Sequence, residues 1–254
     1  MIKVIILGAG NVAFHLTNEL LKNKKVELLQ VYNRNLNKIE YLKHSVEITD
    51  NLTKLNKNGD IYIIAISDDA ISTFSNQLKL PNKLVVHTSG SVPLNTLQSK
   101  SNKGVFYPLQ TFSKNKKVTF NAIPICIEAE ISDNLELLEK FAKIISNKCY
   151  IINSKQRKQL HLAAVFVNNF VNHLYYLGNK ICDENNIPFE ILHPLIKETS
   201  EKLNKLSPFA AQTGPAKRND IKTIEKQLAM LPKNQKEIYT LLTDSIINTY
   251  GKKL

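Results

Sequence analysis

Long apolar runs and cysteines are both scarce in this sequence. No apolar run approaches the ~20 residues that a membrane-spanning helix needs, and the chain has three cysteines, two methionines and no tryptophan. Cys126, Cys149 and Cys182 lie far apart and match no metal-ligand spacing, so we expect free thiols and no metal site. The first residues also lack the basic, apolar and small-residue regions of a signal peptide. These absences predict a cytoplasmic protein with no membrane partner.

Acidic residues are outnumbered by basic ones. The chain has 34 lysines and arginines against 22 aspartates and glutamates, which gives a net charge of +12. The lysines are scattered, however, and the densest run, residues 114–117, has no interleaved aromatic side chains that could stack on bases. We therefore predict a lysine-rich surface facing solvent and no nucleic-acid partner. The same positive field would favour a polyanionic cofactor.

Two kinds of pattern divide the 254 residues. In the first part short apolar segments alternate with helical periodicity, which predicts a parallel sheet with helices on both faces. From about residue 156 onward the periodicity is helical throughout, and prolines separate the helices. The expected strands are 2–7, 26–33, 61–66, 84–87, 105–107 and 123–127, and the expected helices between them are 11–24, 36–42, 70–78 and 135–145.

A glycine-rich turn follows the first expected strand. Gly8-Ala9-Gly10-Asn11-Val12-Ala13 fits the pattern G-x-G-x-x-A, in which the first glycine makes a tight turn, the second lets the backbone approach a pyrophosphate and the alanine keeps the helix close to the sheet. The free N–H groups of the helix N-terminus would then face the phosphates. We therefore predict an N-terminal Rossmann domain over residues 1–153 with a dinucleotide on Gly8 to Val12, and an all-α domain over residues 154–254.

The end of the second expected strand selects the cofactor. NAD sites place an Asp or Glu there to accept from the ribose 2′-hydroxyl, whereas this chain has Asn33 and Arg34 and no acid before Glu40. Arg34 can pair with a 2′-phosphate and Asn33 can donate to it, so the sequence favours NADP over NAD. The alternative is that Arg34 belongs to an ordinary surface loop.

Two further loops end strands, where open parallel sheets gather their ligands. Ser67 and Asp68 follow the most hydrophobic strand, and His87, Ser89 and Gly90 follow the next one. We expect all five residues to flank the cofactor. Ser67 or Asp68 could instead cap the following helix, and His87 could be a hydrogen-bonded histidine of the core.

Residues 156–179 read as one long helix with an apolar middle. At about 100° per residue, His161, Asn168, Asn172 and Asn179 fall on one polar stripe. Because the rest of the middle is apolar all round, we expect the helix to be buried and the stripe to meet either other helices or a substrate. Those two alternatives stay open.

A turn near residue 214 contains a second set of polar candidates. Gln212 and Arg218 flank Gly214-Pro215, and a substrate carboxylate would be a natural partner for Arg218. Asp220 is near enough in sequence to neutralise Arg218 instead, which would make the turn purely structural.

These motifs together resemble a family of bacterial NADP oxidoreductases whose C-terminal helical half is a domain of unknown function. The resemblance rests on the glycine turn, residues 68–71 and 87–91, the segment 104–112, the helix with His161 and Asn168, and residues 212–220. More distantly, the layout is similar to pyrroline-5-carboxylate reductase, prephenate dehydrogenase and the 6-phosphogluconate and 3-hydroxyacid dehydrogenases. The hydroxyacid enzymes have a Lys four residues before an Asn on the long helix, where this chain has Ala164. The resemblance implies NADP, a dimer-forming helical domain and a reaction at the domain junction.

We therefore expect an NADP-dependent oxidoreductase that moves a hydride to or from a small, anionic metabolite. His161 is the expected acid or base, because imidazole titrates near neutral pH. Asn168 and Gln212 would position the substrate, and Arg218 would bind its anionic end. The alternative is an NADP-binding redox sensor or regulator without turnover, and in both cases we expect a homodimer formed through the C-terminal helices.

Overall fold

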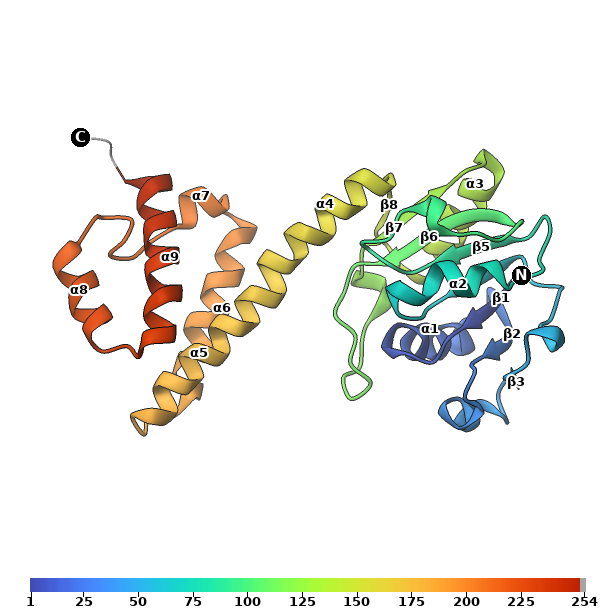
Figure 1. Cartoon of the computed structure of the whole chain (residues 1–254), viewed down its shortest axis with the longest axis horizontal. Helices are drawn as coiled ribbons and strands as arrows, with labels where there is room; N and C mark the ends of the chain where they lie inside the picture. Colours follow the sequence, from blue (N-terminus) through green and yellow to red (C-terminus); the bar gives the residue numbers. More distant parts are fainter. Residues whose placement is uncertain (252–254) are drawn as a thin grey trace. The chain divides into compact units, whose positions relative to one another are not determined.

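A computed structural model describes residues 1–251, and the chain divides into two compact units, one of residues 1–165 and one that begins at Phe166. The first unit is built on an eight-stranded sheet in the order β3-β2-β1-β4-β5-β6-β7-β8 (Figure 1). The strands are β1 (Ile2–Leu7), β2 (Val26–Tyr32), β3 (Glu47–Thr49), β4 (Ile61–Ile64), β5 (Leu84–His87), β6 (Asn102–Pro108), β7 (Ile125–Ala129) and β8 (Cys149–Ile151).

The predicted α/β fold is confirmed, with one correction to the sheet. β6 and β7 pair antiparallel, while the other neighbouring strands pair parallel. The reason lies in residues 109–124, which form an irregular connection with one short 3₁₀ turn, Phe120–Ala122. A parallel pair needs a long crossover, usually a helix, whereas this loop returns the chain beside the strand it has just left.

The helices of the described residues follow the strands as the alternation predicted. They are α1 (Asn11–Lys22), α2 (Ile71–Asn76), α3 (Ser132–Ile145), α4 (Ser154–Ala164), α5 (Val171–Glu184), α6 (His193–Glu201), α7 (Pro208–Ala211), α8 (Ile221–Ala229) and α9 (Lys233–Tyr250). The helix expected over residues 36–42 is instead a pair of 3₁₀ turns, Leu36–Lys38 and Glu40–Leu42. No helix of residues 1–251 is long and apolar enough to cross a membrane.

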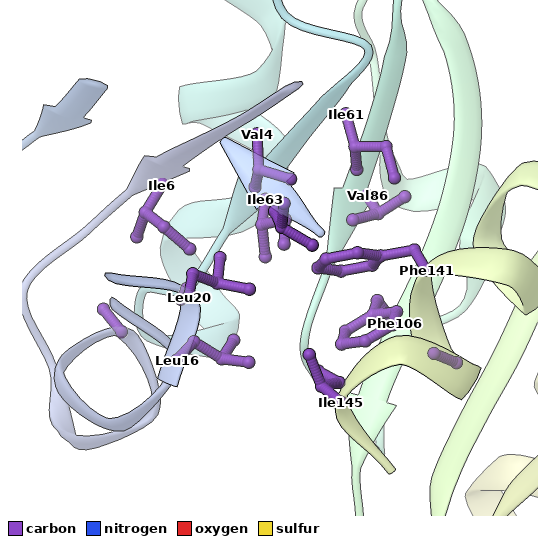
Figure 2. Packing of buried hydrophobic residues seen from close by; sticks show 14 of the residues in the cluster. Val4, Ile6, Leu16, Leu20, Ile61, Ile63, Val86, Phe106, Phe141 and Ile145 are labelled. Atoms are coloured by element: carbon purple, nitrogen blue, oxygen red, sulfur yellow. The ribbon is translucent and has the colours of Figure 1, made fainter. Parts of the chain in front are cut away.

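α1 and α3 cover one face of the sheet. Leu16 and Leu20 of α1 meet Ile6 and Ile63 in the same buried cluster that holds Phe141 of α3 (Figure 2). Further along the sheet Phe141 packs against Phe106 of β6 with ring centroids 4.8 Å apart and ring planes tilted by 38°. Each of these aliphatic side chains stabilises the fold by about 1.5–3 kcal/mol when it is buried, so this layer holds the glycine turn between β1 and α1 in place.

The opposite face of the sheet contacts α2 and α4. Ile71 of α2 belongs to the cluster of Ile5 and Val85, while Leu160 of α4 contacts the smaller cluster of Val105, Tyr107 and Cys126. α4 therefore belongs to the sheet-containing unit, although the domain boundary was expected at residues 153 and 154, where β8 passes into α4.

The expected long helix runs from Ser154 to Glu184, but it is neither uniform nor buried. Between α4 and α5 the segment Val165–Phe170 is π-helical. In this chain Phe166, Val167 and Phe170 expose half or more of their surface, so the prediction of a buried helix is wrong for the single chain. The π-helical turn is wider than an α-helical turn, and the 100° spacing that aligned His161 with Asn168 therefore does not hold across it.

Candidate active site

The glycine turn between β1 and α1 has the backbone that the sequence pattern requires. Gly8 has φ of +138°, and a Cβ there would lie 2.2 Å from the Ala65 carbonyl oxygen after β4. Gly10 is the N-cap of α1 and provides no side-chain cap. The first N–H groups of the helix are therefore free for an anion, and only glycine fits at position 8.

A cavity of about 690 Å³ adjoins this turn, within the range of small-molecule sites. All of its lining residues belong to the sheet-containing unit. Of the predicted cofactor residues, eight line it: Gly8, Ala9, Gly10, Asn11, Val12, Asn33, Arg34 and Ser67. The glycine cradle and the open helix N-terminus fit the pyrophosphate of a dinucleotide.

At its end next to β2, the cavity is lined by cationic side chains and by no carboxylate. Arg34 and Lys38 both line it and are exposed, and the lining includes no acidic side chain. Neither residue forms a salt bridge with a carboxylate of the described chain. The Asn33 side chain donates to the Asn35 carbonyl oxygen at 2.7 Å, which fixes the loop. This end suits a 2′-phosphate.

The loop after β4 has one residue in the cavity and one outside it. Ser67 lines the cavity and makes no side-chain cap for the following 3₁₀ turn. Asp68 lies outside the lining, where its Oδ2 accepts from Ser91 Oγ at 2.5 Å. No side-chain hydrogen bond therefore supports the alternative that Ser67 caps this turn. Asp68 connects the loop after β4 to the loop after β5 through its hydrogen bond with Ser91.

The loop after β5 places Thr88 in the cavity, while His87, Ser89 and Gly90 lie outside the lining. His87 is fully buried, and its Nδ1 accepts from the Ser89 N–H at 3.2 Å. Burial and the nearby Arg157 charge lower the pKa of His87 to about 4. His87 is thus a neutral histidine of the interior, and its buried Nε2 has no hydrogen-bond partner among the described residues.

His161 lies at the carboxyl end of β6 and contacts a residue to which the sequence assigned no role. Tyr107 Oη and His161 Nδ1 are 3.1 Å apart, and a Cβ on Gly90 would lie 2.6 Å from both Nδ1 and the Tyr107 ring. Gly90 therefore leaves the space in which the two side chains meet. Burial raises the pKa of the Tyr107 hydroxyl to about 12.

A buried ion pair attaches the start of α4 to the sheet. Arg157 is 1% exposed, and its guanidinium pairs with Glu128 of β7 and donates to the Val92 carbonyl oxygen at 2.7 Å. Ser154 at the start of α4 also donates to Glu128. Because His161 follows one turn after Arg157, this network sets the position of the imidazole over the sheet.

The other three predicted site residues belong to the second unit. Asn168 is exposed in the π-helical segment, and the Gln212 side chain donates to the Thr213 carbonyl oxygen at 3.0 Å. Arg218 is exposed and makes no salt bridge with the described carboxylates. Asp220 caps α8 and accepts from the Thr223 hydroxyl at 2.8 Å; this hydrogen bond, and to a smaller extent the Arg218 charge, lower the pKa of Asp220.

Comparison with known proteins identifies the family of this chain. Residues 3–90 match a family model described as NADP oxidoreductase, coenzyme F420-dependent, and residues 123–246 match a domain of unknown function, DUF2520. A crystal structure from Bacteroides fragilis, described as a "putative NADP oxidoreductase", shares 38% identity over 97% of this chain and 98% of its own, with a TM-score of 0.87. The chain belongs to this NADP oxidoreductase family.

More distant structures share the fold of the oxidoreductase. A reductive aminase from Aspergillus terreus, solved with NADPH and ethyl levulinate, has a TM-score of 0.73 at 12% identity, over 99% of this chain and 95% of its own. A pyrroline-5-carboxylate reductase from Coxiella burnetii has a TM-score of 0.58 at 14% identity, over 96% of both chains. A comparison with curated protein sequences finds no significant match. The predicted family, enzyme class and NADP cofactor are confirmed.

Sequence reasoning missed three residues of the oxidoreductase: Tyr107, which contacts His161, and the ion pair of Arg157 and Glu128. Tyr107 was placed at the end of the expected strand 105–107 and given no role, while Arg157 and Glu128 were not singled out. The sequence contains no clear signal for Arg157, because it lies among the polar residues 154–159 of α4, as an arginine of an exposed helix surface would. It contains none for Glu128 either, since the pairing of Glu128 depends on the antiparallel return of β7.

Proposed function

We propose that this oxidoreductase transfers a hydride between NADP and the C=O, C=N or C–OH group of a small, anionic metabolite, at the junction of its two units. When bound, the cofactor supplies or accepts the hydride. The observation that carries the proposal is the glycine cradle with an acid-free, cationic end, next to a loop that leads from Thr88 to the Gly90–His161 contact. A dinucleotide site and a titratable side chain are therefore joined by one short loop.

Four residues would handle the substrate. His161 exchanges the proton that must accompany the hydride, because an imidazole can donate a proton from one ring nitrogen and accept one at the other. Asn168 and Gln212 orient the reacting group through their amides. Arg218 binds the anionic end, and its exposed guanidinium without a carboxylate partner in the described chain supports this assignment.

We also propose that the oxidoreductase is a cytoplasmic homodimer formed through its C-terminal helices. Phe166, Val167 and Phe170 expose 60%, 74% and 51% of their surface, and their spacing places them on neighbouring turns of one helical stretch. Monomers rarely expose contiguous apolar patches of this kind, and the symmetric patch of a second copy would cover it. Light scattering should give a dimer for the wild type and a monomer for Val167→Glu. The control Ile131→Glu, which changes an exposed apolar residue of the first unit, should leave the dimer intact.

The enzymatic proposal is tested in two steps. Fluorescence titration should show NADPH binding more tightly than NADH. A panel of imines, keto acids and hydroxy acids, scored by NADPH absorbance, should then identify a substrate class that the wild type turns over. His161→Gln should bind NADPH as the wild type does while it loses most of the turnover. If His161→Gln keeps wild-type turnover, the proton role is wrong.

A further inference from the structure

The Tyr107–His161 contact is made entirely within the sheet-containing unit. Tyr107 comes from the end of β6 and His161 from α4, and Tyr107 is 9% exposed. Their polar atoms are 3.1 Å apart and their ring planes are inclined at 68°. Gly90 passes beside both groups so closely that any larger residue would separate them.

The surroundings of Tyr107 determine the direction of this hydrogen bond. Within residues 1–251, His161 Nδ1 is the only hydrogen-bond partner of the hydroxyl. Burial raises the pKa of Tyr107 to about 12, and the neighbouring Cys126 and Asp68 add to this, while the Arg157 charge opposes it. The hydroxyl therefore keeps its proton at neutral pH and needs an acceptor. Nδ1 can accept only when it is unprotonated, which leaves the imidazole proton on Nε2.

We propose that Tyr107 is the positioning residue for His161: its hydroxyl donates to Nδ1 and holds the imidazole in the Nε2–H tautomer, so that Nε2 is the atom that donates to the substrate. This inference rests on the proposed role of His161. It adds the tautomer, the donating atom and a second residue to the proton path.

The proton path balances in the reductive direction. As the carbon of a C=O or C=N group accepts a hydride, the electron pair of the double bond moves to oxygen or nitrogen, which takes the Nε2 proton. Nδ1 takes the Tyr107 proton in the same step, and the negative charge remains on the phenolic oxygen. Burial opposes that phenolate, and the Arg157 charge only partly offsets this opposition. The reverse relay restores the pair, since Nε2 takes a proton from water and Nδ1 returns its own to Tyr107.

The test measures the tautomer directly, in cofactor-free, full-length protein labelled with ¹⁵N. Long-range ¹H–¹⁵N spectra at pH 7.5 distinguish the two imidazole nitrogens, and the signals that disappear in His161→Gln assign His161. We expect the wild type to be predominantly Nε2–H. Tyr107→Phe, which removes one oxygen atom, should give a mixture in which the Nδ1–H share rises severalfold. Tyr150→Phe, a change to an exposed tyrosine of the same unit, should leave the spectrum unchanged.

Gly90→Ala provides a second route to the same result, because it separates the two side chains without removing either. A wild-type Nδ1–H tautomer, or an unchanged tautomer ratio in both variants, would overturn the inference. Failure of the proposed function has a different signature, since absent NADPH binding or absent turnover leaves these spectra unaffected. With an active substrate, Tyr107→Phe should lower kcat about tenfold at unchanged NADPH affinity.

Discussion

Replacing Arg34 by alanine should change the cofactor preference of the oxidoreductase without changing its fold. The guanidinium is exposed, lines the cavity and makes no salt bridge with a carboxylate of the described chain. Its removal therefore breaks no internal contact that holds the fold together. The effect should appear only with a ligand that brings a negative charge to this end of the cavity, which is the 2′-phosphate that distinguishes NADPH from NADH.

The size of the effect follows from the exposure of Arg34. A hydrogen bond to a charged group stabilises by about 1.5–3 kcal/mol, and solvent screening at an exposed position places Arg34 at the lower end of that range. A loss of about 1.4 kcal/mol corresponds to a tenfold change in affinity. Lys38 lines the same cavity and retains part of the attraction. We therefore expect Arg34→Ala to weaken NADPH binding about tenfold and to leave NADH binding within about twofold.

Fluorescence titrations of both nucleotides at one fixed ionic strength measure this difference. Lys43→Ala is the matched control, because Lys43 has the same charge nearby but pairs with Glu40 at 2.8 Å and lies outside the cavity lining. Equal weakening of NADPH and NADH by Arg34→Ala would refute the assignment of the 2′-phosphate. An equal loss in Lys43→Ala would show instead that the general positive field, and not Arg34, attracts the cofactor.

Three other predictions follow from the first unit. Gly8→Ala should lower the free energy of unfolding, measured in urea, by about 3 kcal/mol, because the new Cβ meets a backbone carbonyl oxygen at 2.2 Å. In Gly10→Ala the new Cβ would meet its nearest neighbour only at 3.9 Å. This variant should therefore keep the wild-type free energy of unfolding and bind NADPH more weakly. Glu128→Gln should destabilise the protein by about 3 kcal/mol in the same assay, since it leaves the buried Arg157 guanidinium without its counter-charge. The pKa of His87 is lowered from 6.5 to about 4, so between these pH values the unfolded chain binds a proton that the folded chain does not. The free energy of unfolding should therefore fall by about 3 kcal/mol as the pH is lowered from 6.5 to 4. His87→Gln should remove that part of the pH dependence.

The sequence predicted the elements that depend on local pattern and missed those that depend on pairing. The apolar runs of β1, β4 and β5 and the glycine turn are local signals, and the structure has them where they were expected. β3 and β8 are three residues long, too short for a period-2 pattern to be distinguished from loop. They exist because a neighbouring strand in the sheet offers hydrogen-bonding groups to pair with.

The site divides in the same way. Residues near the pyrophosphate were predictable because glycines and a helix N-terminus have a fixed chemical meaning. The polar stripe on the long helix was not predictable, since the π-helical segment Val165–Phe170 changes the angle between His161 and Asn168. Its apolar side chains are exposed in the single chain, although an apolar helix middle predicts burial.

One short loop links the glycine-turn cavity to the contact with His161. Thr88 lines the cavity, and two residues later Gly90 lies against His161. The Ser89 hydroxyl accepts from the N–H of Ser91 at 3.2 Å, so the loop between the two sites is held by its own hydrogen bonds. The small side chain of Gly90 allows the close approach to His161, and the internal hydrogen bonds hold the loop between Thr88 and Gly90. The cofactor cavity and the Tyr107–His161 contact therefore both belong to the first unit.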